Sequence, residues 1–268
     1  MYDKRREQRT GQYHVKVLGA ERHLYAPGEG ENDPRDDRIE TWLADMIDGP
    51  AAKPLGRARR NLRLDNDGRS RLAAFVAAQD MRTPKARDML VALFQSELDA
   101  WYAGLARDLP RLRKSILDAT GVDYSERELR DAHGSYSVEV TKGVWLDFIR
   151  DNLNRAAERL HHGVWHVVRA PANHEFLTND IGILKFSGSF QRPVKYALGF
   201  FASRDRWLVP LDPKAALAIG PGDDTTKIRA DAAWMDATND QIVTDAARFV
   251  YSRTCDLRVS RLIGESAT

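Results

Sequence analysis

Four polar side chains stand at the edges of apolar patterns in this sequence, and their types suit phosphate-ester chemistry. They are Glu40, Gln79, Arg82 and Asp180. Carboxylates can hold a divalent metal ion or act as a general base, and an arginine can neutralise the charge of a phosphate. The sequence therefore predicts a candidate catalytic site from these residues. A divalent metal would suit the site, but no motif identifies the metal.

The same residues also have structural interpretations, which the sequence leaves open. Gln79 and Arg82 continue a helical apolar stripe and could form a buried polar network that ties two helices to a sheet. Asp180, followed closely by Gly182, is also typical of a plain turn. Because an unpaired buried guanidinium is costly, we expect Arg82 to point inward and meet a carboxylate, with Glu40 or Asp180 as its partner.

A second candidate site is an arginine-rich segment within residues 51–66. Its members are Arg57, Arg59, Arg60 and Arg63. Clustered arginines of this kind are predicted to bind nucleic acid, with an affinity that falls steeply with salt because phosphate contacts release counterions. The alternative is a solvated helix face, which is what most runs of charge turn out to be.

Helices are expected to position most of these residues. Leu72, Phe75 and Val76 recur at helical spacing, and their helix meets a second one at Thr83 and Pro84, where threonine suits the N-cap and proline the first helical position. The second helix should run to about residue 109. Further helices are predicted at residues 38–48, 110–119 and 138–162.

Two details of this helical region affect the site. The helix at residues 38–48 should end at Gly49 and Pro50, and it places Glu40 beside the buried face formed by Leu43 and Ile47. Residues 121–135 have the composition of a loop.

The apolar pattern changes from helical spacing to short alternating runs near Gly163. Short strands are predicted at 12–18, 164–170, 175–180, 183–186, 207–211 and 215–218, and the last helix buries Ile242, Phe249 and Val250. The fold class is therefore α+β, with a predominantly helical N-terminal two-thirds, a small antiparallel or mixed sheet in the C-terminal third and a final helix. We expect a single domain over 1–268, divided into a helical part at 35–162, a sheet part at 163–220 and a closing helix at 236–252.

The composition excludes several classes of protein. The 268 residues are 43% hydrophobic and 30% charged, with a formal net charge of +2, so no global field draws the chain to nucleic acid or to a membrane. No apolar run approaches the roughly 20 residues of a membrane span, and the charged N-terminus lacks the apolar core of a signal peptide. Cys255 is the single cysteine, which excludes an internal disulfide. We expect a cytoplasmic protein without membrane contact.

Several segments together resemble one bacterial family. They are Tyr2-Asp3-Lys4, Arg22 to Tyr25, Ile39-Glu40 with Leu43-Ala44, Leu72 to Gln79, Arg82-Thr83-Pro84, Phe176 to Asp180, Pro210 to Pro213, and Asn239 with Ala247 to Ser252. In order and spacing they resemble the family called domain of unknown function 4238. That family opens with a paired-histidine and proline motif ahead of the Tyr-Asp-Lys segment. We expect that this chain either starts further upstream or has lost the motif.

The family pattern also differs within the chain. It tends to have Ser-Asp-Asn-Pro where this sequence has Asn179 to Gly182, and a family glutamate falls at Ile47. Relatives occur in bacterial mobile elements, some of them in anti-phage defence loci. The resemblance implies a toxin-like, defence-associated protein, and the leading hypothesis is a metal-dependent nuclease acting on RNA or DNA.

The alternative hypothesis is a non-enzymatic sensor or protein-interaction module of a defence system. Nucleic acid and a partner protein are the expected partners, and the sequence does not predict an oligomeric state. The geometry of the acids separates the two hypotheses, since carboxylates that line an open cleft favour an enzyme and mutually paired groups favour the module.

Overall fold

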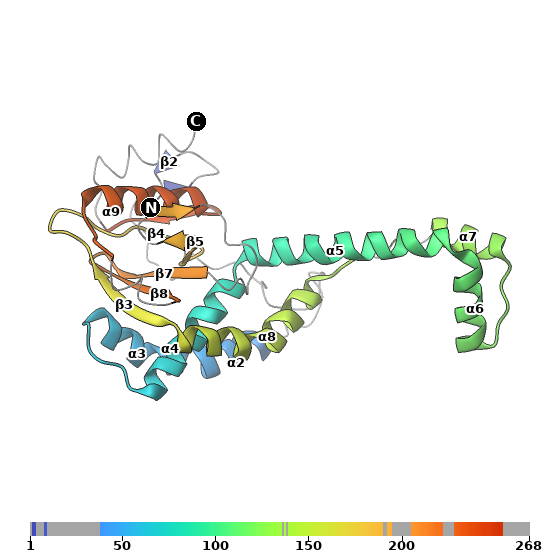
Figure 1. Cartoon of the computed structure of the whole chain (residues 1–268), viewed down its shortest axis with the longest axis horizontal. Helices are drawn as coiled ribbons and strands as arrows, with labels where there is room; N and C mark the ends of the chain where they lie inside the picture. The colour runs from blue at the N-terminus through green and yellow to red at the C-terminus, as the bar shows by residue number, and fades with distance from the viewer. Residues whose placement is uncertain are drawn as a thin grey trace. The chain divides into compact units, whose positions relative to one another are not determined.

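The computed structural model describes residues 2–3, 8–9, 38–135, 137, 139–189, 192–194, 205–221 and 228–253. Their fold is α+β, with a helical N-terminal region, an antiparallel sheet in the C-terminal third and a late helix, which confirms the predicted fold class (Figure 1). The chain divides into two compact units, Met1–Ala86 with Ile149–Thr268, and Arg87–Phe148. The single domain expected from the sequence stays a prediction.

The first helical segment is longer than predicted, because the chain passes Gly49 and Pro50 without leaving helical geometry. It consists of α2 (Arg38–Leu43), a π-helical turn η1 (Ala44–Asp48) and α3 (Gly49–Arg59). The N–H of Gly49 donates to the carbonyl of Ala44, five residues back, as a π-helix requires. Pro50 lies in the first turn of α3, where a missing N–H costs no hydrogen bond.

The central helix pair agrees with the prediction. Helix α4 (Asn66–Met81) buries Leu72 and Val76, and α5 (Pro84–Arg107) begins at the predicted proline. The hydroxyl of Thr83 accepts a hydrogen bond from the N–H of Ala86 at 3.2 Å, which caps the first turn of α5.

The main sheet of the first unit is antiparallel and has the strand order β3-β8-β7-β5-β6. Its strands are β3 (Val164–Arg169), β5 (Leu184–Ser189), β6 (Arg192–Val194), β7 (Asp205–Asp212) and β8 (Ala215–Gly220). Every residue of β8 is buried, as expected for a short apolar run in the middle of a sheet. The sheet lies within the predicted residues 163–220.

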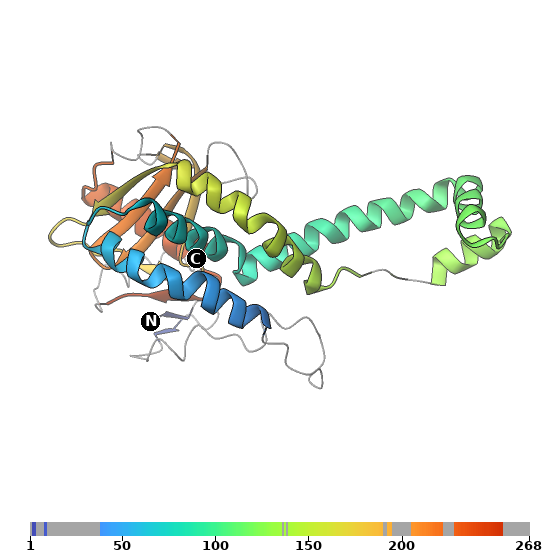
Figure 2. The ribbon, with the colours of Figure 1, turned by 90° about the horizontal axis from the view of Figure 1, so that it is seen from below.

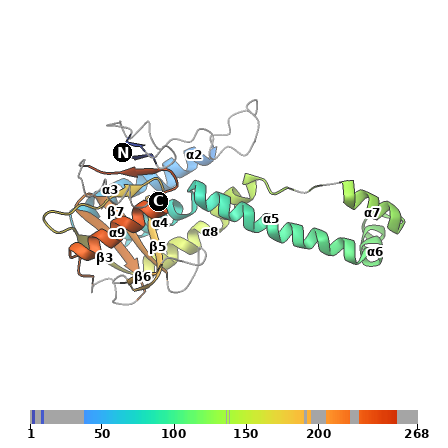
Figure 3. The same ribbon diagram turned by 90° about the horizontal axis from the view of Figure 1, so that it is seen from above.

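Helices cover both faces of this sheet. Helix α9 (Ala232–Asp245) crosses one face, where Met235 and Ile242 join a buried cluster with Leu184 and Leu208 (Figure 3). Helices α3 and α4 and the C-terminal part of α8 (Lys142–His162) lie side by side over the opposite face (Figure 2). The end of α3, the start of α4 and the end of α8 are therefore held in one layer on the same sheet.

A second, smaller sheet has the strand order β2-β1-β9-β4. Its strands are β1 (Tyr2–Asp3), β2 (Gln8–Arg9), β4 (Thr178–Asn179) and β9 (Phe249–Tyr251). The closing helix was predicted to run to 252, and this is wrong, because α9 ends at Asp245 and Phe249 and Val250 belong to β9. Val250 pairs with both Tyr2 and Asn179, so the strand gains partners that an isolated segment does not have.

The second unit is helical. Between α5 and α8 it contains α6 (Leu109–Thr120) and α7 (Glu126–Ser135). The loop predicted at 121–135 is wrong for its second half, where Ser125 and Glu128 form a reciprocal capping box at the start of α7. The hydroxyl of Tyr102 donates to the carbonyl of His133 at 2.8 Å, and their rings stack at 3.9 Å.

Two remaining sequence predictions concern the N-terminal region and membranes. The strand predicted at 12–18 lies outside the described residues. Within the described ranges, no helix combines the length and the apolar character needed to cross a membrane.

Candidate functional site

Gln79 and Arg82 meet at the C-terminal end of α4 in a network of satisfied polar groups. The Nε and Nη2 of Arg82 donate to Gln79 Oε1 at 3.0 and 2.6 Å, and its Nη1 donates to both oxygens of Asp48 at 2.8 and 2.9 Å. Gln79 Nε2 donates to the carbonyl of Ile181 at 3.2 Å. The guanidinium also lies over the ring of Phe75. The network joins η1, α4 and the turn after β4.

The prediction for Arg82 is therefore confirmed in part. Its side chain points inward, with 17% of it exposed, and it binds a carboxylate. Among the described residues that carboxylate is Asp48, so the expected partner, Glu40 or Asp180, is wrong. Asp48 lies at the end of a π-helical turn, whose spacing differs from the regular helical period that was expected for residues 38–48.

Glu40 and Asp180 lie apart from this network. Glu40 is exposed on α2. The carboxylate of Asp180 accepts backbone hydrogen bonds from Ala247, Arg248 and Phe249 at 2.9, 2.7 and 3.1 Å, which fixes the entry into β9. Of the four predicted catalytic residues, Gln79 and Arg82 are hydrogen-bonded to each other, Asp180 binds the backbone and Glu40 is exposed. Their catalytic roles stay predictions.

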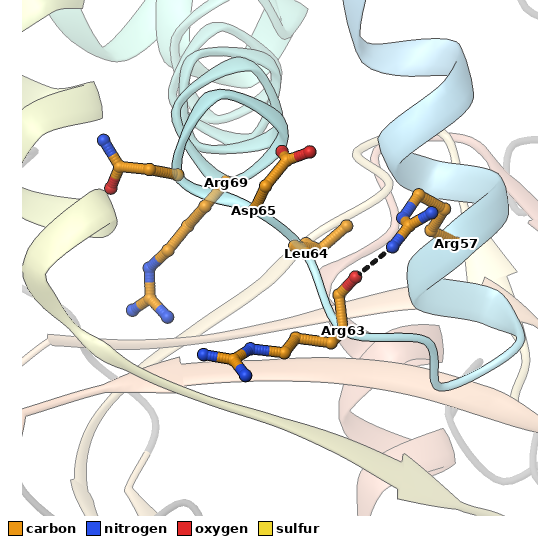
Figure 4. A pocket seen from close by; sticks show the side chains of 6 residues that line it. Arg57, Arg63, Leu64, Asp65 and Arg69 are labelled. Carbon is orange, nitrogen blue, oxygen red and sulfur yellow. Dashed lines mark hydrogen bonds between the residues drawn. The ribbon is translucent and has the colours of Figure 1, made fainter.

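An arginine-lined hollow of about 510 Å³ lies at the corner between α3 and α4 (Figure 4). Its lining consists of Arg57, Arg63, Leu64, Asp65, Asn66 and Arg69. Arg57 Nη2 donates to the carbonyl of Arg63 at 2.5 Å, while its Nε is buried without a hydrogen-bond partner in the part of the chain that the structure describes. The Arg63 side chain is exposed. The hollow therefore offers unused guanidinium donors.

Arg69 is held in a fixed place beside this hollow. Its Nε donates to the carbonyl of His161 at 2.7 Å, its Nη2 donates to the carbonyl of Gly163, and its guanidinium lies 4.7 Å from the ring of Trp165. Burial lowers the pKa of Arg69. Sequence analysis missed Arg69, although it is the next arginine after Arg63 and falls in the first turn of α4.

The remaining arginines of the predicted nucleic-acid patch lie outside the hollow. Arg59 Nε donates to Asp212 Oδ2 at 3.3 Å, and its carbonyl accepts from Arg169 Nη2 at 2.7 Å. Arg60 is exposed. Of the four arginines grouped by sequence proximity, Arg57 and Arg63 line the hollow and Arg59 and Arg60 do not, and their predicted role in binding nucleic acid stays a prediction.

One carboxylate lines the hollow. Asp65 is the N-cap of α4, and its Oδ1 accepts from the N–H of Gly68 at 2.7 Å. The N-terminus of a helix also attracts anions through its free N–H groups and its dipole. Three guanidinium groups and a helix N-terminus thus face one acid. No group of three or more metal-ligating side chains occurs among the residues described.

The fold and this site define an α+β protein with a cationic hollow at a helix corner. The chain belongs to the family described as Protein of unknown function (DUF4238), which matches residues 1–256. Searches of the curated proteins and of the solved structures each returned no match.

Proposed function

We propose that this protein is a non-enzymatic nucleic-acid sensor of bacterial anti-phage defence, acting in the cytoplasm, and that it binds phosphate through the arginine-lined hollow. The observation that carries the proposal is that Arg57, Arg63 and Arg69 line one hollow, with Asp65 as the acid among the described residues of its lining. Guanidinium groups suit phosphate because they donate several hydrogen bonds in a fixed plane. The defence setting rests on the resemblance to relatives in defence loci, and a sensor would pass its signal to a partner protein.

The state of the acids supports a sensor more than a nuclease. A carboxylate that binds a metal or activates water needs free lone pairs in an open site. Of the predicted catalytic acids, Asp180 accepts three backbone hydrogen bonds and Glu40 is exposed on α2, while Asp48 is paired with Arg82. The metal-dependent nuclease activity expected from the sequence stays a prediction, which the same experiment tests.

The experiment measures the binding of fluorescent RNA and DNA strands to the full chain by anisotropy over a series of salt concentrations. The double variant Arg57→Gln and Arg63→Gln should bind at least about tenfold more weakly, and its slope of log affinity against log salt should fall by about two, because two phosphate contacts are lost.

Arg71→Gln is the matched control, because Arg71 is an exposed arginine of α4 that pairs with Asp67 and does not line the hollow. Its affinity should equal that of the wild type. Equal affinity in the double variant and the wild type would refute the proposed site. Strand cleavage by the wild type with a divalent metal would replace the sensor by the nuclease.

A further inference from the structure

The shape of the arginine-lined hollow suits a compact group more than a continuous strand. Its volume of about 510 Å³ lies within the range of small-ligand sites, which is roughly 300–1,000 Å³. Proteins that follow a single strand use an extended groove with aromatic platforms on which bases stack. The lining of this hollow contains arginine, leucine, aspartate and asparagine side chains, with no aromatic ring among them. Its described lining therefore offers bases no aromatic platform.

Arg57 provides a fixed and unsatisfied donor in this hollow. Its Nη2 is tied to the carbonyl of Arg63, so the guanidinium cannot swing away without losing that hydrogen bond (Figure 4). Its Nε is buried without a partner among the described residues. The described residues therefore do not use the full hydrogen-bonding capacity of the Arg57 guanidinium.

The charges that remain available favour a ligand with more than one negative charge. Arg59 is paired with Asp212, whereas Arg57, Arg63 and Arg69 line the hollow together with Asp65, whose carboxylate caps the N-terminus of α4, so among the described residues three positive charges face one negative charge. A phosphate monoester carries a charge of about −1.5 to −2 at neutral pH and has three terminal oxygens, whereas an internal phosphodiester carries a single charge. Three guanidinium groups against one carboxylate leave a net charge of about +2, which complements the monoester better.

We propose that the hollow recognises a phosphate monoester, in the form of the phosphorylated end of a nucleic-acid strand. This inference rests on the proposed function, because it names the part of the nucleic acid that the same hollow takes. The strand would leave through the open side of the hollow, and its internal phosphates would add contacts to exposed arginines such as Arg60.

The test compares one short single-stranded RNA with a 5′-hydroxyl, a 5′-phosphate or a 3′-phosphate, bound to the full chain at one fixed salt concentration. A phosphorylated end should bind at least about tenfold more tightly than the hydroxyl end. The preference should disappear in Arg57→Gln and in Arg63→Gln and persist in Arg71→Gln. Inorganic phosphate and a nucleoside monophosphate should compete only with the phosphorylated strands.

The outcomes separate this inference from the proposed function. Equal binding of hydroxyl and phosphate ends, lost in both hollow variants, would refute the inference and leave the proposed function standing. Tight binding of the nucleoside monophosphate without strand binding would keep the monoester site and refute nucleic-acid recognition. Absence of all binding would refute both. If Arg57→Gln does not fold, Arg63→Gln decides the question, because the Arg63 side chain is exposed.

Discussion

Arg82 shows how one side chain can be structural although its position suggests chemistry. Its guanidinium holds Asp48 and Gln79 at the same time, which a lysine cannot do because it lacks the planar fork. Arg82→Lys should therefore lower the free energy of unfolding by about 1–2 kcal/mol, measured by urea denaturation. The loss stays below the roughly 3–5 kcal/mol of a fully buried broken pair, because 42% of Asp48 is exposed.

Arg71→Lys provides the comparison for this variant within the same helix. Arg71 pairs with Asp67 one turn away, and both side chains are at least half exposed. Such a pair contributes only about 0.3–0.5 kcal/mol, so its replacement should leave the unfolding midpoint nearly unchanged. If Arg82→Lys were as stable as Arg71→Lys but lost a cleavage or protection activity, Arg82 would belong to a functional site.

His161 makes the stability of the fold sensitive to acid. Burial, then the charge of Arg69 and then His162 lower the pKa of His161 below 6.5. As the pH falls, the unfolded chain takes up this proton first, so stability is present above about pH 6.5 and is lost as the pH falls through the lower pKa of the folded state. Urea denaturation between about pH 8 and about pH 5 should show a smaller loss of stability in His161→Gln than in the wild type.

An equal loss in both proteins would show that His161 does not contribute to the acid sensitivity. The control is the wild type and the variant at about pH 8, where the imidazole is neutral in folded and unfolded chains alike. A difference in stability at about pH 8 reflects the loss of the hydrogen bond between His161 Nδ1 and the Ser70 hydroxyl, which are 3.2 Å apart, and not the uptake of a proton.

The candidate residues could be predicted from sequence only as far as local spacing reaches. The inward direction of Arg82 followed from the stripe of Leu72 and Val76, since α4 is a regular helix. Its partner Asp48 depended on the π-helical turn, whose spacing differs from the helical period that sequence analysis assumes. Arg69 was missed because its contacts with His161 and Gly163, at and just after the end of α8, join residues 92 and 94 positions apart.

At the scale of elements, substitutions at two glycines in the left-handed region allow the cost of backbone strain to be measured apart from the cost of a side-chain clash. Gly121 and Gly182 both have φ of 74°, but a Cβ at Gly121 would meet nothing within 4 Å, whereas at Gly182 it would lie 3.2 Å from Gln79 Nε2. Gly121→Ala should cost about 1–2 kcal/mol from the backbone alone. Gly182→Ala should cost more, because the new methyl group displaces Gln79 from Ile181.

Chemical denaturation of both variants measures the difference between their losses of stability. The circular dichroism spectrum of each folded variant checks that its secondary structure is intact. An equal cost would mean that Gln79 adapts to the methyl group without losing its hydrogen bond. In that case the network around Arg82 would be more tolerant than its geometry indicates.

Some elements carry a local signal in the sequence, whereas others depend on distant partners. The start of α7 carries such a signal, because Ser125 and Glu128 have the spacing of a capping box, although the composition of residues 121–135 led to the prediction of a loop. The end of α9 has no clear signal in the sequence, because Phe249 and Val250 continue the apolar spacing of the helix. Asp180, far away in the chain, removes these residues from the helix by binding the backbone at 247–249.

At the scale of the whole molecule, the two compact units differ in how much apolar surface they bury. All six residues of β8 in the first unit are buried, whereas the buried residue of α6 in the second unit is Leu109. Leu93 and Trp101 of α5 recur at helical spacing in the sequence, yet they are 55% and 61% exposed. Sequence spacing identifies such a stripe but does not say what covers it.

Hydrogen exchange should therefore distinguish the units. Amides of β8 should exchange through global unfolding, and those of α6 should exchange faster through local opening, because few buried contacts hold that helix. Mass spectrometry of peptides from the exchanged protein measures both rates in one experiment. Equal protection of α6 and β8 would show that the chain unfolds as one cooperative domain, as the sequence led us to expect.

The pairing of β1 with β9 joins residues that a ribosome makes at very different times. Tyr2 of β1 pairs with Val250 of β9. One edge of β1 therefore stays without its partner until nearly all of these residues have been synthesised. At about 5–20 residues per second, that wait is on the order of ten seconds or more. An uncovered strand edge is a template for wrong pairing, and the two-residue length of β1 keeps that edge short during the wait. The small sheet is thus completed at the end of translation.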